Sequence, residues 1–398
     1  MALRQGSKRK VVFFMTYFIG IDIAKFTHYA AILDEDGQVI EHAFSFENNK
    51  SGFDVLLSKL PSCGKSQLQF GFESTAHYHQ NLAAFLTENG YQTSLINPLL
   101  SKRFRGFSIR DIKNDAVDAM TIASFMVFQK QEIESFEVNE LKELCLMRDD
   151  LIQKQSRELI RLNAMLDKVF PEFKPFTKTL KTKGVQSLLK KYSTATEIKK
   201  VRVDALANLL NSARNSYSIE KVSDLKALAK ISVGFHSTSI SFNIKTTITQ
   251  LELLREQITQ VDSLIVKAMK ELESPILNIP GMGYIQAAYI LSVIVNISRF
   301  SSPSKLLAFA GLDPKIRQSG MWNARSTRMS KRGNKLLRYA LIWSANNVRN
   351  NSNTMDAYYS KKRAEGKSHY NALGHCAKKL VNYIFFTLNN PESNFILD

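Results

Sequence analysis

The stretch YFIGIDIAK, residues 17–25, determines the fold of the first part of this chain, because it is an apolar run that carries one acid, Asp22. The stretch LQFGFESTA, residues 68–76, repeats the pattern with Glu73. Short apolar runs rich in aromatic and β-branched residues predict buried strands. We therefore expect Asp22 at the centre of the first strand and Glu73 at the end of a later one.

The element order around these two stretches predicts an α/β domain over residues 17–130. Three β-like runs come first (YFIGIDIA, HYAAILDE and QVIEHAFSF), and Asp36-Gly37 marks the second turn. An amphipathic stretch, a strand at QLQFGFE, a helix closed by Gly90, a strand at QTSLIN and helices beyond Pro98 follow. This is the element order of the ribonuclease H fold, although other α/β folds open similarly.

Asp115 and Asp118 lie three residues apart in IKNDAVDAMTIASFM, residues 112–126, which has a helical pattern. Residues at this spacing share one helix face, so both carboxylates can point to one place. Taken singly, each acid could be a strand-end cap or a solvated helix residue. Together with Asp22 and Glu73 they predict a divalent metal site, because Mg²⁺ prefers oxygen ligands and binds a few carboxylates.

The composition favours a polyanionic partner. The 398 residues include 54 Lys and Arg against 36 Asp and Glu, a formal net charge of +18. Such an excess favours nucleic acid through counterion release, with a membrane surface as the rival partner. A metal site on a basic protein indicates phosphodiester chemistry, in which two divalent ions about 4 Å apart stabilise the attacking and leaving oxygens.

Neither export nor membrane insertion is predicted. No apolar run reaches the roughly 18 residues of a transmembrane helix, and the apolar stretch near the N-terminus continues into the first strand without a small-residue cleavage site. Cys63, Cys145 and Cys376 lie far apart and form no Cys-x-x-Cys pair, which excludes a zinc knuckle and suits a reducing compartment. We expect a cytosolic protein that binds nucleic acid.

Two seams of apolar residues predict a helical coiled-coil region over residues 137–275, because steps of three and four are typical of helices packed on each other. The first seam comprises Leu141, Cys145, Arg148, Ile152, Gln155, Leu159, Leu162, Leu166 and Val169. The second comprises Ile244, Ile248, Leu251, Leu254, Ile258, Val261, Ile265 and Leu272. They form either an antiparallel hairpin within the chain or an oligomerisation stalk. The insert between them, at about 174–240, is Lys-rich and helical in pattern.

Residues 276–390 are predicted to form a mainly α-helical domain that begins with a helix-hairpin-helix. In ILNIPGMGYIQAAYILSVI, an apolar helix end, the hairpin Pro280-Gly281-Met282-Gly283 and an apolar helix follow one another. The two glycines would let the backbone approach phosphate, and the helix N-terminus would offer free N–H groups to it. A tight turn without phosphate contact is the alternative.

The stretch PKIRQSGMWNARSTRMSKRGNK, residues 314–335, is the candidate DNA-binding segment. It contains no acid and seven basic residues: Lys315, Arg317, Arg325, Arg328, Lys331, Arg332 and Lys335. Because the segment lies between apolar helices in an already basic protein, phosphate contact is favoured over a merely solvated surface.

Ser319 is a candidate nucleophile in this segment. A serine hydroxyl attacks only when a base, a metal or nearby cations favour its alkoxide, and basic residues surround Ser319. Locally, Ser319-Gly320 is also a common turn dipeptide. Ser326 and Ser330 have the same basic surroundings, so local chemistry leaves the choice among the three serines open.

The motifs together resemble a known family. IGIDIAK, GFEST, KNDAVDA and the C-terminal series IPGMG, SRF, AGLDP, QSG and SKRGNKLLR are similar, in composition and order, to those of the DEDD transposases of the insertion-sequence one-ten family, relatives of the Piv and MooV site-specific DNA invertases. The resemblance covers residues 17–170 and 245–385. Asn114 replaces the Thr common at that position, and the middle insert is long for the family.

This resemblance implies a RuvC-like domain that binds Mg²⁺, with Mn²⁺ as an alternative, through Asp22, Glu73, Asp115 and Asp118. It implies a C-terminal transposase domain in which Ser319 attacks DNA and forms a covalent phosphoserine link. Members act on donor element ends and target DNA as tetramers (dimers of dimers), with composite sites between subunits, and several are guided by a non-coding bridge RNA. A RuvC-like nuclease that uses metal-activated water is the alternative enzyme, and a nucleic-acid architectural protein is the non-enzymatic one.

Overall fold

The protein forms two compact units in the computed structural model, Met1–Val138 and Asn139–Asp398. The structure describes residues 15–73, 77–96, 98–105, 114–129, 139–211, 217–314, 318–319, 322–323 and 328–392. Each unit has its own hydrophobic cores, so each is described by itself.

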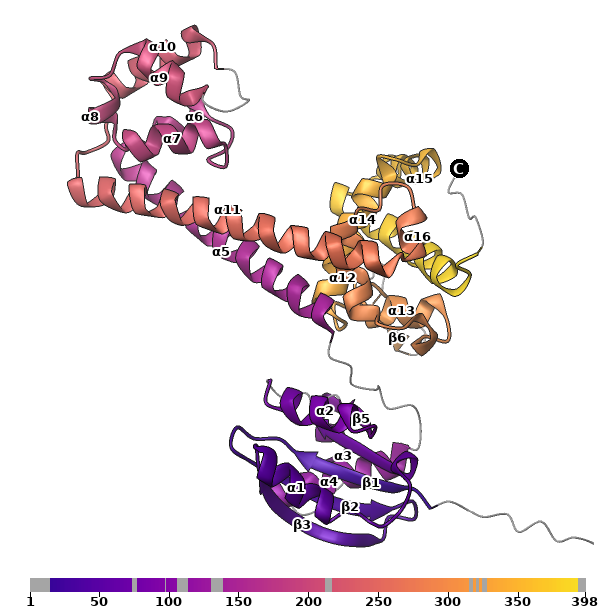
Figure 1. The fold of residues 1–398 in the computed structure, drawn as a ribbon. Helices are drawn as coiled ribbons and strands as arrows, with labels where there is room; N and C mark the ends of the chain where they lie inside the picture. The colour runs from indigo at the N-terminus through magenta and orange to yellow at the C-terminus, as the bar shows by residue number, and fades with distance from the viewer. Residues whose placement is uncertain are drawn as a thin grey trace, which may run out of the picture. The chain divides into compact units, whose positions relative to one another are not determined.

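The first unit contains a mixed five-stranded sheet (Figure 1). Its strands are β1 (Tyr17–Asp22), β2 (Thr27–Asp34), β3 (Val39–Glu47), β4 (Leu68–Glu73) and β5 (Gln92–Ile96). The spatial order is β3-β2-β1-β4-β5, with β1, β2 and β3 antiparallel and with β4 and β5 parallel to β1. The predicted sequence of three antiparallel strands followed by alternating helices and strands is confirmed.

Helices cover both faces of this sheet. They are α1 (Lys50–Ser58), α2 (His79–Glu88), α3 (Pro98–Arg105) and α4 (Asp115–Gln129). Because strand side chains alternate between faces, Ile19 and Ile21 of β1 join a core with α1 and α2. Phe18 joins a second core with Ile122 and Met126 of α4. The alternating apolar pattern of β1 therefore supplies two cores at once.

Gly20 lets α4 lie directly against β1. A Cβ atom built at Gly20 would lie 2.5 Å from the carbonyl oxygen of Ala119 and 2.7 Å from the Cα atom of Ala123. Real side chains essentially never approach backbone that closely. The small residues on both elements therefore permit a close backbone contact between the middle of β1 and the middle of α4.

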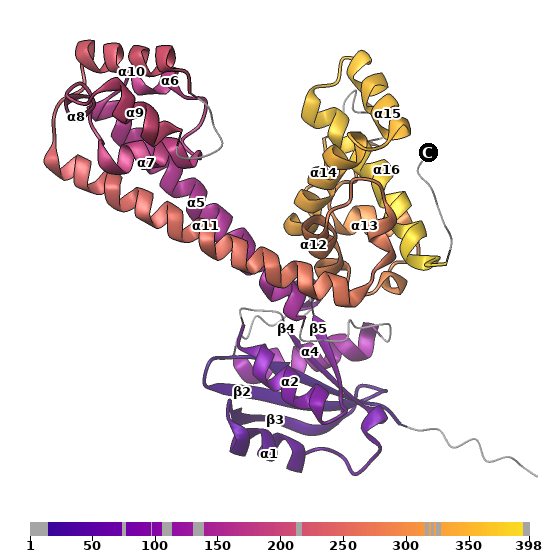
Figure 2. The same cartoon turned by 45° about the horizontal axis from the view of Figure 1, so that its top comes forward.

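A long helical hairpin forms the centre of the second unit. Helices α5 (Glu140–Val169) and α11 (Thr238–Leu272) lie side by side (Figures 1 and 2). Arg148 forms an ion pair with Asp262, and Arg161 donates a hydrogen bond to Asn243. These pairs run in opposite directions along the two helices, so the hairpin is antiparallel, one of the two predicted alternatives.

The predicted seams are largely buried, with one error at the end of α11. Cys145, Leu162, Leu166 and Val169 of the first seam are buried, as are most members of the second. Leu272 is 54% exposed, and Met269 takes the buried position instead. The prediction for Leu272 is wrong because α11 ends at that residue, where the seam has no further partner turn.

The described residues of the Lys-rich insert, 174–211 and 217–240, form short helices at the end of the hairpin where α5 ends and α11 begins (Figures 1 and 2). They are α6 (Phe173–Phe176), α7 (Lys183–Lys191), α8 (Ala195–Ile198), α9 (Val203–Leu210) and α10 (Ile219–Ile231). Their apolar side chains share one core with the ends of the two long helices.

The rest of the second unit is mainly helical, as predicted, and its core contains Tyr289, Leu341 and Leu380. Its helices are η2 (Pro275–Asn278), α12 (Tyr284–Ile294), η3 (Ile297–Arg299), α13 (Pro303–Phe309), α14 (Lys335–Arg349), α15 (Asn353–Ala364) and α16 (His369–Asn389). The element before the Pro280 hairpin is therefore the short 3-10 helix η2, and α12 follows the hairpin.

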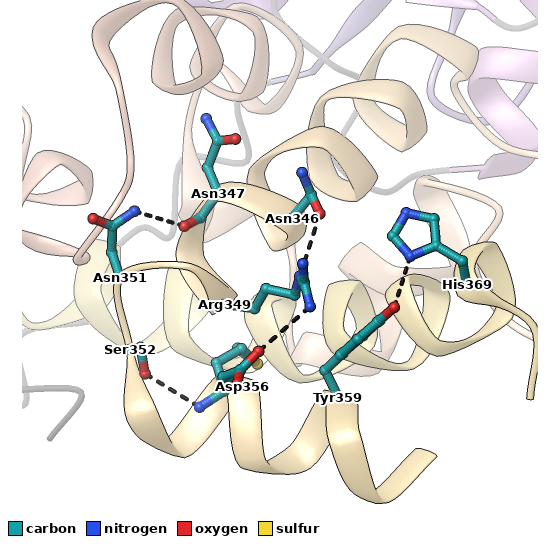
Figure 3. Close-up of polar contacts among 9 residues, drawn as sticks. Asn346, Asn347, Arg349, Asn351, Ser352, Asp356, Tyr359 and His369 are labelled. Carbon is teal, nitrogen blue, oxygen red and sulfur yellow. Dashed lines mark hydrogen bonds and ion pairs between the residues drawn. The ribbon is translucent and has the colours of Figure 1, made fainter. Parts of the chain in front are cut away.

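A polar network joins α14, α15 and α16 (Figure 3). Arg349 donates hydrogen bonds to Asn346 and to Asp356, and its guanidinium lies 4.1 Å from the centre of the Tyr359 ring. The hydroxyl of Tyr359 shares a hydrogen bond of 2.7 Å with Nδ1 of His369. Arg349 thus joins α14 to α15, and Tyr359 joins α15 to α16.

None of the helices in the described ranges is both long and apolar enough to cross a membrane. The three cysteines are free thiols. Cys145 and Cys376 are buried in the core of the second unit, so they serve packing there.

Replacing Gly20 with Ala should destabilise the first unit by at least about 2 kcal/mol, because the new methyl group would collide with the backbone of α4. Chemical denaturation of the two proteins measures the difference. Gly64→Ala is the control, because Gly64 is exposed and its nearest neighbour is the flexible Gln67 side chain. Equal stability of the two variants would show that α4 does not lie against Gly20.

Candidate active site

Asp22 and Glu73 lie at the same edge of the sheet. Asp22 is the last residue of β1, and Glu73 is the last residue of β4. The two strands are parallel neighbours, and Ile21 pairs with Phe72 one residue before each acid. The carboxyl ends of the strands therefore bring the two acids side by side.

Asp115 and Asp118 reach the same edge from α4. Both lie in the first turn of that helix, and Asn114 receives a hydrogen bond from Val117 N at its start. Asp22 is on the same face of β1 as Gly20, since it lies two positions further along the strand. The close contact at Gly20 consequently brings the first turn of α4 next to Asp22.

The four carboxylates interact electrostatically. Burial raises the pKa of Asp22, and the negative charges of Asp118, Asp115 and Glu73 raise it further, to about 6. Like charges at one place disfavour ionisation in this way. The structure thus brings together the four acids that the sequence singled out, within electrostatic range of Asp22.

Arg105, at the end of α3, is the positive charge that opposes this repulsion. Its guanidinium lies 2.9 Å from the carboxylate of Asp118, and the two side chains are only 27% and 14% exposed. Arg105 also lowers the pKa of Asp22. Its Nε atom is buried and has no hydrogen-bond partner in the described part of the chain, so the arginine is only partly satisfied.

Ser101, also on α3, donates a hydrogen bond to Glu73. Sequence reasoning missed both Ser101 and Arg105. The one available signal was that LLSKRFR, residues 99–105, follows the last strand directly and is helical in pattern. Helix α3 therefore adds a hydroxyl and a guanidinium to the acids of β1, β4 and α4.

The donor set suits a hard divalent cation. Four carboxylates with repelling charges supply the oxygen ligands that Mg²⁺ prefers, and a cation would relieve the repulsion on Asp22. In the present side-chain positions, no three His, Cys, Asp or Glu residues of the described ranges converge closely enough to hold an ion. The carboxylate of Asp118 instead forms an ion pair with Arg105.

The candidate DNA-binding segment belongs to the second unit. Arg328, Lys331, Arg332 and Lys335 are exposed there, from the residue before the isolated bridge at Met329 to the first residue of α14. Lys315, Arg317 and Arg325 lie outside the described residues. The exposed side chains are free to contact a polyanion.

Close backbone contacts hold the loop that carries these cations. Gly333 lies so near the backbone of Phe309 and Gly311 that any Cβ atom would collide with it. Arg338 donates hydrogen bonds of 3.0 and 3.3 Å to the carbonyl oxygens of Ala310 and Gly333. Lys331 has a positive φ of 54°, an unfavourable value for a non-glycine residue. The loop is therefore a fixed support for its basic side chains.

Ser319 lies in a small two-stranded ribbon of the second unit. Strand β6 (Gln318–Ser319) pairs with β7 (Trp322–Asn323), with Ser319 opposite Trp322. Ser326 lies outside the described residues. The hydroxyl of Ser330 donates a hydrogen bond to Asp313, so that serine has a structural role in the loop.

Gly281 of the predicted hairpin is explained by packing inside the protein. It has a positive φ of 79°, and a Cβ atom there would lie 2.7 Å from the carbonyl oxygen of Asn347 and 2.9 Å from Nδ2 of Asn351. Gly283 is the N-cap residue of α12. Phosphate contact by these two glycines stays a prediction.

The comparisons with known proteins agree with these features. A family model described as a transposase matches residues 19–171. A second model, described as "Transposase IS116/IS110/IS902 family", matches residues 273–360. The chain belongs to the IS110 transposase family. Its members include proteins of insertion elements, and this chain is an enzyme of that DNA-acting class.

Full-length relatives support this assignment. The chain is 24% identical to the insertion element IS116 uncharacterized 44.8 kDa protein of Streptomyces clavuligerus, over 94% of this chain and 95% of the relative. It is 23% identical to the IS110 43.6 kDa protein of Streptomyces coelicolor, over 94% of each. It is 25% identical to the pilin gene-inverting protein of Moraxella lacunata, over 82% of this chain and 81% of the relative.

Asp22→Asn should stabilise the protein in chelator at pH 8. The pKa of Asp22 is about 6 in the folded chain and 3.8 without the fold, so its ionisation destabilises the fold progressively as the pH rises from 3.8 through 6. Neutralising the half-exposed side chain should add about 1–2 kcal/mol above pH 6.

At pH 4 the melting temperatures of the variant and the native protein should converge. Thermal denaturation at both pH values measures this, with Asp36→Asn, the same charge change in an exposed turn, as control. A midpoint at pH 8 that is unchanged or lower in Asp22→Asn would contradict the repulsion among the four acids.

Proposed function

We propose that this protein is a DNA transposase that cuts and exchanges DNA strands through a covalent phosphoserine intermediate. The observation that carries the proposal is the cluster of Asp22, Glu73, Asp115 and Asp118, in which burial and the charges of the other three acids raise the pKa of Asp22 to about 6. A strongly perturbed carboxylate beside other acids is typical of a functional site.

The fold of the first unit supports a RuvC-like, ribonuclease H-like assignment. Its sheet has the order β3-β2-β1-β4-β5, with three antiparallel strands and two parallel ones. Asp22 and Glu73 end the adjacent strands β1 and β4, and helix α4 carries the other two acids. We propose that this arrangement is the DEDD centre of the enzyme.

Asp22, Glu73, Asp115 and Asp118 would hold Mg²⁺, or Mn²⁺ in its place. When bound, the metal supplies positive charge to the phosphate and favours the ionised form of an attacking oxygen. The acids themselves would fix the position of the metal at the sheet edge. Arg105, which pairs with Asp118 in this structure, would be available to a phosphate oxygen if a cation took over the charge of that carboxylate.

Ser319 provides the attacking hydroxyl in this proposal. Its oxygen attacks the phosphorus atom, the P–O bond to the 3′ or 5′ oxygen of the DNA breaks, and that oxygen leaves with a proton. The neighbouring phosphates are bound by four exposed basic residues, Arg328, Lys331, Arg332 and Lys335. Lys and Arg make such phosphate contacts in DNA complexes independently of the base sequence. The phosphoserine link conserves the energy of the cleaved phosphodiester bond, so the DNA end can be joined to a second strand.

We further propose that the active enzyme is a dimer of dimers and that a non-coding bridge RNA guides it to donor and target DNA. The acids belong to one compact unit and Ser319 belongs to the other. This division is compatible with a composite site in which one subunit supplies the acids and another supplies the serine. The pilin gene-inverting relative supports recombination as the outcome.

Ser319→Ala should abolish the covalent protein–DNA adduct, because the variant has no oxygen at the attacking position. The adduct is detected as a slowly migrating DNA band on a denaturing gel after incubation with element-end DNA and Mg²⁺. Ser330→Ala is the matched control and should retain the adduct, since its hydroxyl already donates to Asp313.

Two outcomes would contradict the assignment of Ser319. An adduct that persists in Ser319→Ala moves the nucleophile to Ser326 or Ser330. DNA that is cut by the native protein, without any adduct and with equal rates in Ser319→Ala, indicates a RuvC-like nuclease that uses metal-activated water instead.

Arg105→Gln should lower the stability in chelator by about 1–3 kcal/mol, because it leaves the largely buried carboxylate of Asp118 without its ion pair. Adding Mg²⁺ should narrow the difference from the native protein, since the metal replaces the lost positive charge. Thermal denaturation with and without Mg²⁺ measures both effects. Lys59→Gln, which breaks the exposed pair with Glu41, is the control. A destabilisation that Mg²⁺ leaves unchanged would show that metal and Arg105 do not share Asp118.

A further inference from the structure

The helical insert carries half of the net charge of the chain. Residues 174–240 contain 13 Lys and Arg and 4 Asp and Glu, a net charge of +9 in 67 residues, whereas the whole chain of 398 residues has +18. The two matched family models end at residue 171 and begin again at residue 273, so this charge lies outside both matches. The insert is therefore a candidate for a polyanion-binding surface of its own.

A cavity of about 280 Å³ lies where the insert joins α5. One wall is a single face of α5, from Leu159 to Phe170, and the other is the chain from Pro171 to Lys181. Its lining residues are Leu159, Asn163, Leu166, Asp167, Phe170, Pro171, Phe173, Lys174, Thr177, Lys178, Thr179, Leu180 and Lys181. The volume is slightly below that of pockets that enclose a small ligand, so the cavity suits a group about as large as one nucleotide.

Three lysines surround this cavity. Lys174, Lys178 and Lys181 are all exposed, and the structure records no ion pair for any of them within the described residues. Asp167 is the one acid in the lining, and Asn163 is the one amide. The cavity therefore has a net positive rim, with a carboxylate and an amide that can bind sugar hydroxyl or base groups.

The wall that carries the lysines is held in place before any ligand binds. Thr177 donates a hydrogen bond of 3.0 Å to the carbonyl oxygen of Thr179, and Lys181 N donates to the hydroxyl of Thr179 at 3.2 Å. Arg255 of α11 donates to the carbonyl oxygen of Lys181 at 3.1 Å and to the side chain of Gln186. A fixed wall reduces the conformational entropy that binding would otherwise cost.

The floor of the cavity is equally fixed. Phe170 and Phe173 are buried, and their ring centres lie 5.6 Å apart. Both belong to the core that the insert shares with the two long helices. The lysines thus project from a rigid body.

We propose that this cavity binds the sugar-phosphate backbone of an unpaired nucleic-acid strand. The lysine rim neutralises phosphates, and the concave site accepts one protruding nucleotide, which a loop or single strand can offer and a regular duplex cannot. The site is separate from the four acids and from the basic loop at Arg328–Lys335. It therefore goes beyond the proposed strand exchange and does not depend on it.

The test uses the full chain and measures binding by fluorescence anisotropy at several salt concentrations. The probes are a single-stranded RNA, a single-stranded DNA and a duplex DNA of one length. One variant carries Lys174→Gln, Lys178→Gln and Lys181→Gln. The control carries Lys191→Gln, Lys199→Gln and Lys200→Gln, an equal loss of charge around α8, which lies on the other side of the insert from α6 (Figures 1 and 2).

The cavity variant should bind single strands at least about tenfold more weakly than the control does at physiological salt. In a plot of log affinity against log salt concentration, the slope for this variant should be smaller in magnitude by about 2. Three lysines are removed, and each phosphate contact on a single strand contributes about 0.7 to the slope. A larger loss with RNA than with DNA identifies RNA as the partner, and the reverse identifies displaced DNA. Affinity for the duplex should fall no more than in the control.

A second variant tests the cavity without changing the charge. Asn163→Trp would fill the space from the exposed face of α5 and should weaken single-strand binding while the slope with salt changes little. Circular dichroism confirms that each variant is folded. Equal losses in the cavity variant and the control, or unchanged binding by Asn163→Trp, would overturn the proposal. Because no step requires Ser319, failure here leaves the adduct experiment unaffected.

Discussion

The backbone contact between β1 and α4 at Gly20 is the constraint on which the candidate active site depends. No side chain stands between the strand and the helix there, so Ala119 and Ala123 reach the strand directly. Asp22 follows Gly20 by two residues on the same face, and Asp115 precedes Ala119 by one helical turn. One close contact in the domain core consequently sets the separation of acids that lie almost a hundred residues apart.

The same contact brings negatively charged side chains close together, and the fold offsets their repulsion only in part. Burial and the repulsion among four carboxylates at one edge raise the pKa of Asp22, and Arg105 offsets part of that repulsion and pairs with Asp118. A site whose charges cancelled fully would be more stable and would have less affinity for a cation. Such a conflict between stability and function is expected where a protein binds charged ligands.

The strands, the helix pair and the acids could be predicted from the sequence because they depend on local periodicity. Asp22 and Glu73 end apolar runs, and the spacing of Asp115 and Asp118 requires only a helix. Arg105 and Ser101 could not be predicted, because their role depends on where α3 packs. The burial of Met269 in place of Leu272 depends on where α11 ends, and the packing of Gly281 on Asn347 depends on tertiary contact.

The distribution of charge in the second unit suggests why a transposase would keep a basic module at the end of a long hairpin. An α-helix rises 1.5 Å per residue, so α5, with 30 residues, is about 45 Å long. The C-terminal helices pack on its first part, up to Ile152, and the insert packs on it from Leu159 onward. A nucleic acid that contacts both the insert and the loop at Arg328–Lys335 must reach from one part of the hairpin to the other. Two weak contacts joined in this way bind more tightly than either does alone, and they accept only partners long enough to reach both.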